Sequence, residues 1–326
     1  MPTTASRAHA DVESLEALEA EWEALWREDA SATPFQSPHW LLPWWRHVGK
    51  GEERALAVRD DDGRLMGLAP LYVYTDAGGR RHLFPVGIGT TDYLGLLARQ
   101  GWEKAVAEAV LERVMHWRDW DVLEWPQLQG TSALLSLPGV EVIAGEPNPV
   151  LALQPPAAIP KSTLANLRTC RNRAARAGTI TYELADAGTI PAYLDALARL
   201  HASRWKERGL PGVLADEAVR ASHAEAAPRL HAAGVLRLHG LRLDGELVAV
   251  LHVLMHRRRC YYYIGGFDPR HAAFSPGSLL LAHAIGEAAR EGAKVFDFLR
   301  GAEAYKYRWG ALDQPMFTLR VRGGLR

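Results

Sequence analysis

The stretch that decides the fold is VLRLHGLRLDGELVAVLHVLMHRRRCYYYIG, residues 235–265. Its apolar and aromatic residues fall into three runs, 235–243, 246–256 and 260–265, with short breaks between them. The first break is Asp244-Gly245, a pair that favours the tight turn of a β-hairpin. The pattern predicts an antiparallel meander of three strands. A loop at 266–277, a helix at 278–290 and a strand at 294–299 are expected to follow it.

The first half of the chain repeats this order. A shift of 182 positions places Asp62-Gly63 on Asp244-Gly245. Two amphipathic helices precede each meander, at 11–27 and 38–48 in the first half and at 162–177 and 191–207 in the second. The remaining first-half elements are strands at 55–59, 65–74 and 81–86, a loop at 87–100, a helix at 102–117 and a strand at 121–125. The sequence therefore predicts an α/β fold (α+β, with mixed sheets) that is built twice.

Five prolines separate the two repeats, at positions 147, 149, 155, 156 and 160. Proline disfavours helix and holds the preceding residue extended. A chain of 326 residues also suits two domains better than one. We therefore expect an N-terminal domain at 1–158 and a C-terminal domain at 159–326.

Composition narrows the class of protein. The chain is 48% hydrophobic and 23% charged, which is typical of a folded globular protein and excludes a disordered one. Two cysteines are too few for a disulfide framework and indicate a reducing compartment. No apolar run reaches the ~18 residues that a membrane span needs, and the first 25 residues are acidic, unlike a signal peptide. We expect a cytoplasmic protein without membrane insertion.

The net charge of zero is the sum of a negatively charged first half and a positively charged second half. Residues 1–155 hold 13 basic and 23 acidic side chains, whereas residues 156–326 hold 25 and 15. The sum argues against a general nucleic-acid coat, and the split points to the second half as the anion-binding half. The predicted helix at 162–177 and the residue before it contribute to the excess of positive charge, with Lys161, Arg168, Arg171, Arg173 and Arg176.

Two segments of the second half carry candidate chemistry. The first, Phe274-Ser275-Pro276-Gly277-Ser278, leads into a helix N-terminus, whose free N–H groups bind anions such as phosphate. An ordinary turn with an N-cap explains the same residues. The second segment is 297–309, where Asp297 interrupts an apolar strand and Glu303, Tyr305 and Lys306 follow closely. A solvated ion pair is the alternative for Glu303 and Lys306, but the convergence of acid, phenol and amine favours a catalytic site.

Other motifs are weaker. Asp92-Tyr93 lies in the loop at 87–100, and we expect it to be exposed and to meet a ligand between the domains. The histidines show no metal-binding spacing, and no serine stands in a nucleophile elbow. We infer neither a metal site nor a covalent nucleophile.

Seven segments along the chain carry a resemblance to a known family: Ser37-Pro38-His39-Trp40, Trp44-Trp45, 67–71, Arg204-Trp205, Ser275-Pro276-Gly277, 297–301 and Tyr305-Lys306. They resemble those of the CelD-type acetyltransferases of the GNAT superfamily, which are associated with cellulose and other polysaccharide biosynthesis. The resemblance covers nearly the whole chain, and the closing Asp-Phe, Gly, Tyr-Lys series is its most specific part. More remotely, the chain resembles the Fem peptidyltransferases, which have two GNAT-like domains and use aminoacyl-tRNA.

The resemblance implies two tandem GNAT-like acyl-CoA N-acyltransferase domains, with the catalytic one second and a degenerate substrate-binding or structural one first. Acetyl-CoA or another acyl-CoA would be the donor, without a metal. The acceptor, an amine or hydroxyl of a small molecule such as a sugar precursor, would attack the thioester directly. Ser275, Gly277 and Ser278 would hold the pyrophosphate, and the strand ending at Gly265 would supply a backbone donor to the oxyanion.

The resemblance also implies roles for the remaining candidates. Tyr305 would protonate the leaving thiolate, Lys306 would stabilise developing negative charge, and Asp297 or Glu303 would accept the acceptor's proton. Asp92, Tyr93 and Trp205 are the expected substrate-binding residues.

One departure from the family pattern leaves alternatives open. The usual GNAT phosphate loop, Arg/Gln-x-x-Gly-x-Gly/Ala, is absent, and residues 274–278 take its place. A transferase that uses aminoacyl-tRNA remains a second hypothesis, and only there is nucleic acid expected as a partner. A non-catalytic accessory subunit of a polysaccharide-synthesis complex is the third.

Overall fold

A computed structural model describes residues 8–153, 159–206 and 209–323. The chain forms two compact units: unit 1 comprises Met1–Glu146 and Pro315–Arg326, and unit 2 comprises Pro147–Gln314. Both units combine helices with sheets of mixed strand orientation, which confirms the predicted fold class.

Unit 2 contains a seven-stranded sheet in the order β11-β12-β13-β14-β15-β10-β16. The predicted meander is confirmed as its centre, formed by β12 (Leu236–Leu243), β13 (Glu246–His256) and β14 (Arg259–Phe267). The other strands are β11 (Ile180–Leu184), β15 (Val295–Asp297), β10 (Asn148–Ala152) and β16 (Leu312–Gln314).

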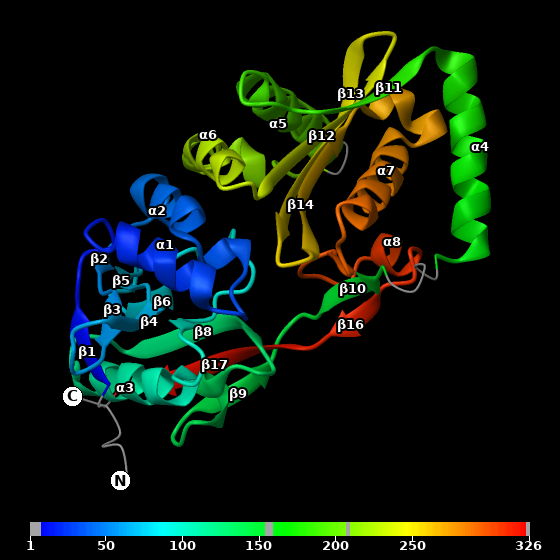
Figure 1. The fold of residues 1–326 in the computed structure, drawn as a ribbon. Coiled ribbons are helices and arrows are strands. Elements are labelled where there is room, and N and C mark those ends of the chain that lie inside the picture. Colours follow the sequence, from blue (N-terminus) through cyan, green and yellow to red (C-terminus); the bar gives the residue numbers. More distant parts are fainter. Residues whose placement is uncertain (1–7, 154–158, 207–208, 324–326) are drawn as a thin grey trace. The chain divides into compact units, whose positions relative to one another are not determined.

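Helices cover both faces of this sheet (Figure 1). α5 (Ile190–Lys206) and α6 (Glu217–Ala232) lie on one face, whereas α7 (Pro276–Arg290) lies on the other with α4 (Lys161–Ala177) packed against it. Short helices complete the unit: η3 (Val213–Ala215), η4 (Pro269–Phe274) and α8 (Ala304–Tyr307). α6 lies between the predicted helix at 191–207 and the predicted strand at 235–243, where the sequence pattern predicts no element. Its apolar positions are mostly alanine, which favours helix but gives little hydrophobic periodicity.

The sheet of unit 2 opens between β14 and β15. Their parallel pairing comprises three residue pairs and ends where Tyr261 faces Asp297. Within the described parts of the chain, β14 then continues to Phe267 beside β13 alone. A register shift between His252 and Val253 of β13 marks a bulge in this part of the ladder. Bulges re-aim side chains and often accompany binding sites.

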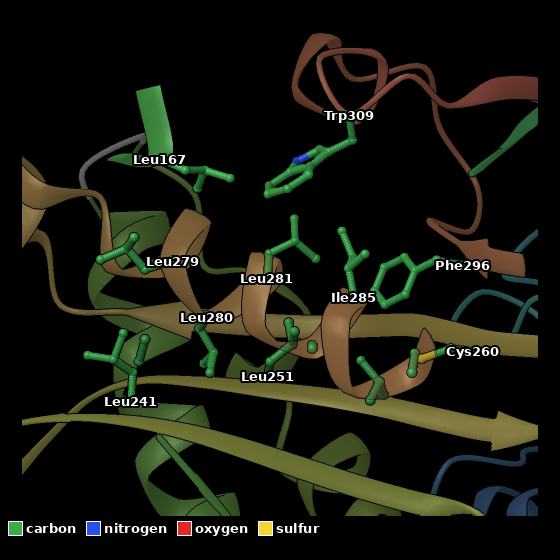
Figure 2. Packing of buried hydrophobic residues seen from close by; sticks show 14 of the residues in the cluster. Leu167, Leu241, Leu251, Cys260, Leu279, Leu280, Leu281, Ile285, Phe296 and Trp309 are labelled. Carbon is green, nitrogen blue, oxygen red and sulfur yellow. The ribbon is translucent and has the colours of Figure 1, made fainter. Parts of the chain in front are cut away.

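The core of unit 2 lies between its sheet and α7 (Figure 2). Leu281 and Ile285 of α7 join Phe296 of β15 and Trp309 in one buried cluster. Cys260 belongs to the same cluster and is a buried, free thiol whose pKa burial raises. The dense packing around Phe296 fixes the start of the segment that carries the candidate catalytic residues.

Unit 1 contains two sheets, ordered β1-β3-β4-β7 and β2-β5-β6-β8-β17-β9. Pro70 interrupts the strand that we predicted at 65–74, so that β4 (Leu65–Ala69) and β5 (Leu71–Thr75) belong to different sheets. Its other strands are β1 (His9–Val12), β2 (Glu52–Glu53), β3 (Leu56–Arg59), β6 (Arg81–Pro85), β7 (Leu97–Ala98), β8 (Val122–Gln129), β9 (Glu141–Ala144) and β17 (Met316–Arg322).

The helices of unit 1 are α1 (Glu19–Glu28), α2 (Pro38–His47) and α3 (Glu103–His116), with short turns at η1 (Pro34–Gln36) and η2 (Ala133–Ser136). The predicted helix at 11–27 begins too early. Residues 9–12 instead form β1, which pairs with β3 from Arg59 to Leu56. The helices at 38–48 and 102–117 are confirmed within one or two residues at each end.

Two strands lie on the other side of the predicted domain boundary from the unit to which they belong. β10 pairs with β15 and β16 of unit 2, although its residues precede position 158. β17 pairs with β8 and β9 of unit 1, although its residues come at the end of the chain. Pro149 is tolerated inside β10 because its carbonyl accepts the Phe298 N–H at 2.9 Å and no N–H is needed there. Pro155 and Pro156 lie outside the described residues.

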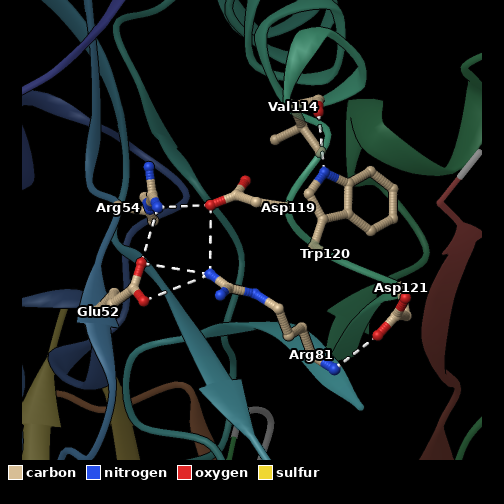
Figure 3. Close-up of polar contacts among 7 residues, drawn as sticks. All are labelled: Glu52, Arg54, Arg81, Val114, Asp119, Trp120 and Asp121. Carbon is tan, nitrogen blue, oxygen red and sulfur yellow. Dashed lines mark hydrogen bonds and ion pairs between the residues drawn. The ribbon is translucent and has the colours of Figure 1, made fainter. Parts of the chain in front are cut away.

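A charged network fixes the chain between α3 and β8 (Figure 3). Asp119 accepts hydrogen bonds from Arg54 at 2.7 Å and Arg81 at 3.2 Å, and both arginines also contact Glu52. Asp121 accepts the backbone N–H of Arg81 at 2.7 Å. These contacts hold β8 in parallel register beside β6, so unit 1 repeats the β14–β15 arrangement.

Truncation of Phe296 tests the core of unit 2. Its side chain is fully buried, so Phe296→Ala should lower the free energy of unfolding by about 3–5 kcal/mol. Leu312 is 75% exposed, and Leu312→Ala should change that free energy by less than ~0.5 kcal/mol. Urea denaturation of both variants measures the difference, and equal stabilities would contradict this packing.

Buried histidines make unit 2 sensitive to acid. Burial lowers the pKa of His201 and His223 to about 4 and that of His239 to about 3, from an ordinary 6.5. Below pH 6.5 these histidines bind protons in the unfolded chain but stay neutral in the folded chain. The free energy of unfolding is therefore highest near neutral pH and falls as the pH drops toward 4. A His223→Gln variant should lose less stability between pH 7 and pH 4 than the wild type. Exposed His116→Gln is the control, and thermal unfolding across this pH range is the measurement.

Candidate functional site

The candidate site lies where β14 diverges from β15. The ring of Tyr262 on β14 packs edge-on against Phe298 and Tyr305, with ring centroids 6.3 and 6.5 Å away. Tyr305 belongs to α8, which follows β15. The two tyrosine hydroxyls share a hydrogen bond, and burial raises the pKa of each above 10. Both phenols therefore keep their protons at neutral pH.

Arg204, in the last turn of α5, joins this pair. It hydrogen-bonds the side chain of Tyr262, and its positive charge opposes the effect of burial by lowering the pKa of that phenol. Its guanidinium carbon also lies 5.6 Å from the ring centroid of Phe267. Phe267 in turn packs against Gly277 in the first turn of α7. The approach is so close that a Cβ atom on Gly277 would lie 3.0 Å from Cδ1 of Phe267. A row of contacts thus leads from Tyr305 to the N-terminal turn of α7.

Two glycines of β14 are required by close approaches. A Cβ on Gly265 would lie 2.9 Å from Cδ1 of Leu251 and 3.1 Å from the hydroxyl oxygen of Tyr262. A Cβ on Gly266 would lie 2.6 Å from the backbone nitrogen of His201 in α5. All three distances are shorter than the ordinary contacts of a Cβ atom. The Gly265-Gly266 pair therefore lets α5 and the Tyr262 hydroxyl pack directly against the strand.

The predicted anion site forms the first turn of α7. Ser275 is the N-cap, has a left-handed backbone with φ of 51° and makes no side-chain cap hydrogen bond. The Ser278 N–H donates to the Ser275 carbonyl at 3.0 Å. Arg173 of the exposed, basic face of α4 donates to the Ala273 carbonyl at 3.1 Å, so that face borders this end of α7. The positions of Ser275, Gly277 and Ser278 agree with the expected geometry, and their binding role stays a prediction.

Lys306 is buried and surrounded by acceptors. Its ammonium donates to the carbonyls of Leu299, Arg300 and Gly301 at 2.7–3.0 Å and pairs with Glu303 at 2.9 Å. Three N–H groups face four oxygens, so these contacts account for all the donors of Lys306. The side chain fixes the turn that links β15 to α8, in which Leu299 has a φ of 58° and Gly301 a φ of 106°.

The two candidate carboxylates differ in environment. Asp297 is fully buried; its Oδ2 atom binds Arg259 at 2.8 Å, and its Oδ1 atom accepts the Leu299 N–H at 2.8 Å. Arg259 also donates to Gln314 at 2.6 Å. Glu303 precedes α8 as its N-cap, and its side chain is 58% exposed. Both carboxylate oxygens of Asp297 thus make contacts inside the sheet, whereas the carboxylate of Glu303 is accessible to solvent.

The three expected substrate-binding residues have different surroundings. Trp205 is half-buried beside His201, and a Cβ on Gly212 would meet both side chains. Asp92 and Tyr93 belong to unit 1 and are buried rather than exposed, which corrects our expectation. Tyr93 stacks on Phe35 with ring centroids 6.3 Å apart, because the loop at 87–100 folds into the unit instead of projecting from it.

Sequence reasoning missed Arg204 and Tyr262 as site residues. Arg204 stands in the Arg204-Trp205 pair that carries the resemblance, and Tyr262 is the middle residue of Tyr261-Tyr262-Tyr263. Three successive tyrosines on a strand alternate between its faces, so the sequence does not tell which of them meets the site.

Among the described residues, no group of three or more His, Cys, Asp or Glu side chains could hold a metal ion. The helices described here include none long and apolar enough to span a membrane.

Known proteins share this architecture. Residues 161–307 match the family model described as "Acetyltransferase (GNAT) domain". The structure of FemX aligns with a TM-score of 0.67 at 13% identity, covering 95% of this chain and 96% of FemX. L-PGS from Bacillus licheniformis aligns with a TM-score of 0.63 at 12% identity, covering 92% and 90%.

A tandem GNAT protein from the clavulanic acid biosynthesis pathway aligns with a TM-score of 0.50 at 14% identity, covering 98% of this chain and 100% of that protein. A search of the curated proteins found no match. The identities are low, so the structures establish the fold alone. Residues 161–307, somewhat less than half of the chain, thus match a GNAT acetyltransferase domain, and the chain as a whole shares the fold of a tandem GNAT protein.

Proposed function

We propose that unit 2 transfers an acetyl or other acyl group from an acyl-CoA thioester to an amine or hydroxyl of a small molecule. The observation that carries the proposal is the row of contacts from the first turn of α7, through Phe267, Arg204 and Tyr262, to Tyr305. These residues lie beside the part of β14 after Tyr261, which no longer pairs with β15. The match of residues 161–307 to a GNAT acetyltransferase domain supports the same reaction class.

The donor would lie along this row. The pyrophosphate of coenzyme A would bind at the first turn of α7, where the helix dipole and the Gly277 N–H favour negative charge. Ser275 and Ser278 would contribute their hydroxyls. The thioester would then reach the divergent part of β14, where the backbone beside Gly265 would donate to the oxyanion.

The chemistry would be a direct attack. The acceptor's nitrogen or oxygen attacks the thioester carbonyl carbon, the C–S bond breaks, and Tyr305 gives its proton to the departing thiolate. The acceptor's proton passes to Glu303, directly or through water. Tyr262 and Arg204 would hold the Tyr305 hydroxyl in place. The proton taken up by Glu303 would then return to the Tyr305 phenolate through water, which restores both groups. Trp205, on the same helix as Arg204, would contact the acceptor.

Lys306 and Asp297 would act as positioning residues. The contacts of Lys306 with three successive carbonyls fix the turn from which α8 and Tyr305 begin. The pair of Asp297 with Arg259 anchors the last paired residues of β14 and β15. We therefore favour Glu303 over Asp297 as the base.

Replacement of a single hydroxyl separates chemistry from binding. Tyr305→Phe should lower kcat by roughly 10²–10⁴-fold and leave the Kd for acetyl-CoA within about threefold. Tyr307→Phe removes the same atom two residues away, where the hydroxyl binds Asp313 at 2.8 Å, and should keep the wild-type rate. Thiol release during acetyl transfer to a panel of amines and amino sugars measures kcat, and calorimetry measures Kd. Equal rates for the two variants would overturn the role of Tyr305.

Two glycines of α7 test the donor site. A Cβ on Gly277 would press on Phe267, whereas a Cβ on Gly286 meets nothing within 4 Å. Gly277→Ala should weaken acetyl-CoA binding by roughly tenfold or more, because the methyl group shifts Phe267 and narrows the approach to the helix end. Gly286→Ala should bind normally and be slightly more stable. If wild-type protein gains no thermal stability from any acyl-CoA, the donor is not a coenzyme A thioester.

A second candidate is transfer from aminoacyl-tRNA. It is favoured by the exposed basic face of α4, formed by Lys161, Arg168, Arg171, Arg173 and Arg176, and by the similarity of the fold to FemX. This reaction predicts binding of tRNA that weakens steeply between 50 and 200 mM salt, on the order of tenfold or more. An Arg168→Gln/Arg171→Gln variant should reduce that salt dependence. Absence of tRNA binding at 50 mM salt excludes it.

The first proposal extends to the identity of the acceptor and to the role of unit 1. We place the acceptor among sugar precursors of polysaccharide synthesis and assign unit 1 a substrate-binding or structural role. If Tyr305→Phe and Lys306→Ala leave the cellular phenotype intact while the protein co-purifies with a synthase, the chain is instead a non-catalytic accessory subunit.

A further inference from the structure

Unit 1 contains a cavity of about 350 Å³ that the proposed acyl transfer does not use. Its walls come from the end of α1, the loop at 93–98 and the end of β8, all within unit 1. Small-molecule sites typically enclose ~300–1,000 Å³, so this volume suits a ligand of about one ring. The neutral polar residues of its lining include Gln100, Gln127, Gln129, Thr131, Ser132 and Tyr93.

Gln127 is the unusual residue in this lining. It has a φ of 58°, a left-handed backbone that a residue with a side chain adopts at an energetic cost. It follows Pro126 at a register shift in the pairing of β8 with β17, between Phe317 and Leu319. This bulge turns the Gln127 side chain toward the cavity.

The amide oxygen of Gln127 is unsatisfied within the described residues. The residue is only 6% exposed, and its Oε1 atom has no hydrogen-bond partner. A buried amide oxygen without a partner is costly, and the cost adds to that of the backbone. Two such costs in one residue at a cavity wall are typical of a binding site that a ligand completes.

The other polar groups of the wall define the chemistry of the ligand. Asp29 is already satisfied, because its oxygens accept the N–H groups of Ser31 at 2.7 Å and Ala98 at 2.9 Å. Gln36 is satisfied as well, because it bonds Thr33 through its oxygen and Gly95 through its nitrogen. Glu103, the second carboxylate of the wall, accepts the Gly101 N–H at 3.1 Å, and its charge disfavours an anionic ligand. The other polar side chains of the wall are neutral amides and hydroxyls, which can both donate and accept hydrogen bonds.

We propose that this cavity is a binding site for an uncharged molecule rich in hydroxyl or amide groups, about the size of one sugar ring. A ligand hydroxyl or N–H donates to Oε1 of Gln127. Neighbouring amide and hydroxyl groups pair with the remaining polar atoms of the ligand. The site is independent of the acyl donor, so its failure and the failure of the proposed acyl transfer are separate results.

Binding is tested directly on the full-length protein. Saturation-transfer NMR and calorimetry with methyl β-glucoside, N-acetylglucosamine and N-acetylglycinamide should detect at least one complex, with glucose 6-phosphate binding at least tenfold more weakly. No binding of the three neutral compounds, or preferential binding of the phosphorylated sugar, overturns the proposal.

A pair of substitutions identifies the site. Gln127→Ala removes the amide and keeps the backbone strain, whereas Gln127→Gly removes both. Each should weaken binding of the neutral ligand by roughly tenfold or more. Without ligand, the Gly variant should unfold roughly 2–4 °C higher than the Ala variant, and not below the wild type. Unchanged binding in both variants, or a lower Tm for the Gly variant than for the Ala variant, contradicts a strained, ligand-completed Gln127.

Discussion

The structure of unit 2 depends on where the pairing between β14 and β15 stops. Three residue pairs join the strands, and the last of them sets Tyr261 opposite Asp297. The ion pair between Asp297 and Arg259 fixes that end of the ladder. Because Asp297 is fully buried, removing either partner would leave an uncompensated charge inside the sheet. One ion pair thus stabilises the point where the opening begins, and Tyr262 and Tyr305 follow this point on the two segments that diverge from it.

The same opening occurs in both units but is used differently. In unit 1, β6 and β8 are parallel only at His82–Val122 and Leu83–Leu123. In unit 2 the opening holds two tyrosines that share a hydrogen bond, whereas in unit 1 the further end of β8 carries the Pro126-Gln127 bulge and a polar cavity. A duplicated fold has thus kept its backbone plan while its side chains have diverged. The opposite charges of the two halves follow the same division.

The meander, most of the long helices and the order of the repeat could be predicted because their signals are local. Hydrophobic period and turn residues such as Asp244-Gly245 need no knowledge of distant contacts. The strands β10, β16 and β17 could not be predicted, since their partners lie far away in the sequence and β16 has only three residues. The roles of Lys306 and Asp297 were also hidden, because the sequence shows their charge but not the oxygens and the guanidinium that they contact.

The position of β17 has a consequence for how the chain reaches its native state on the ribosome. β17 lies between β8 and β9, inside the six-stranded sheet of unit 1, and not at its edge. Residues 1–146 therefore emerge early but cannot close their sheet until residues 316–322 have been synthesised. Unit 2, encoded between them, has all its strands before that moment. The unit that begins first is completed last, and during translation the gap between β8 and β9 exposes unpaired strand edges that are prone to non-native association.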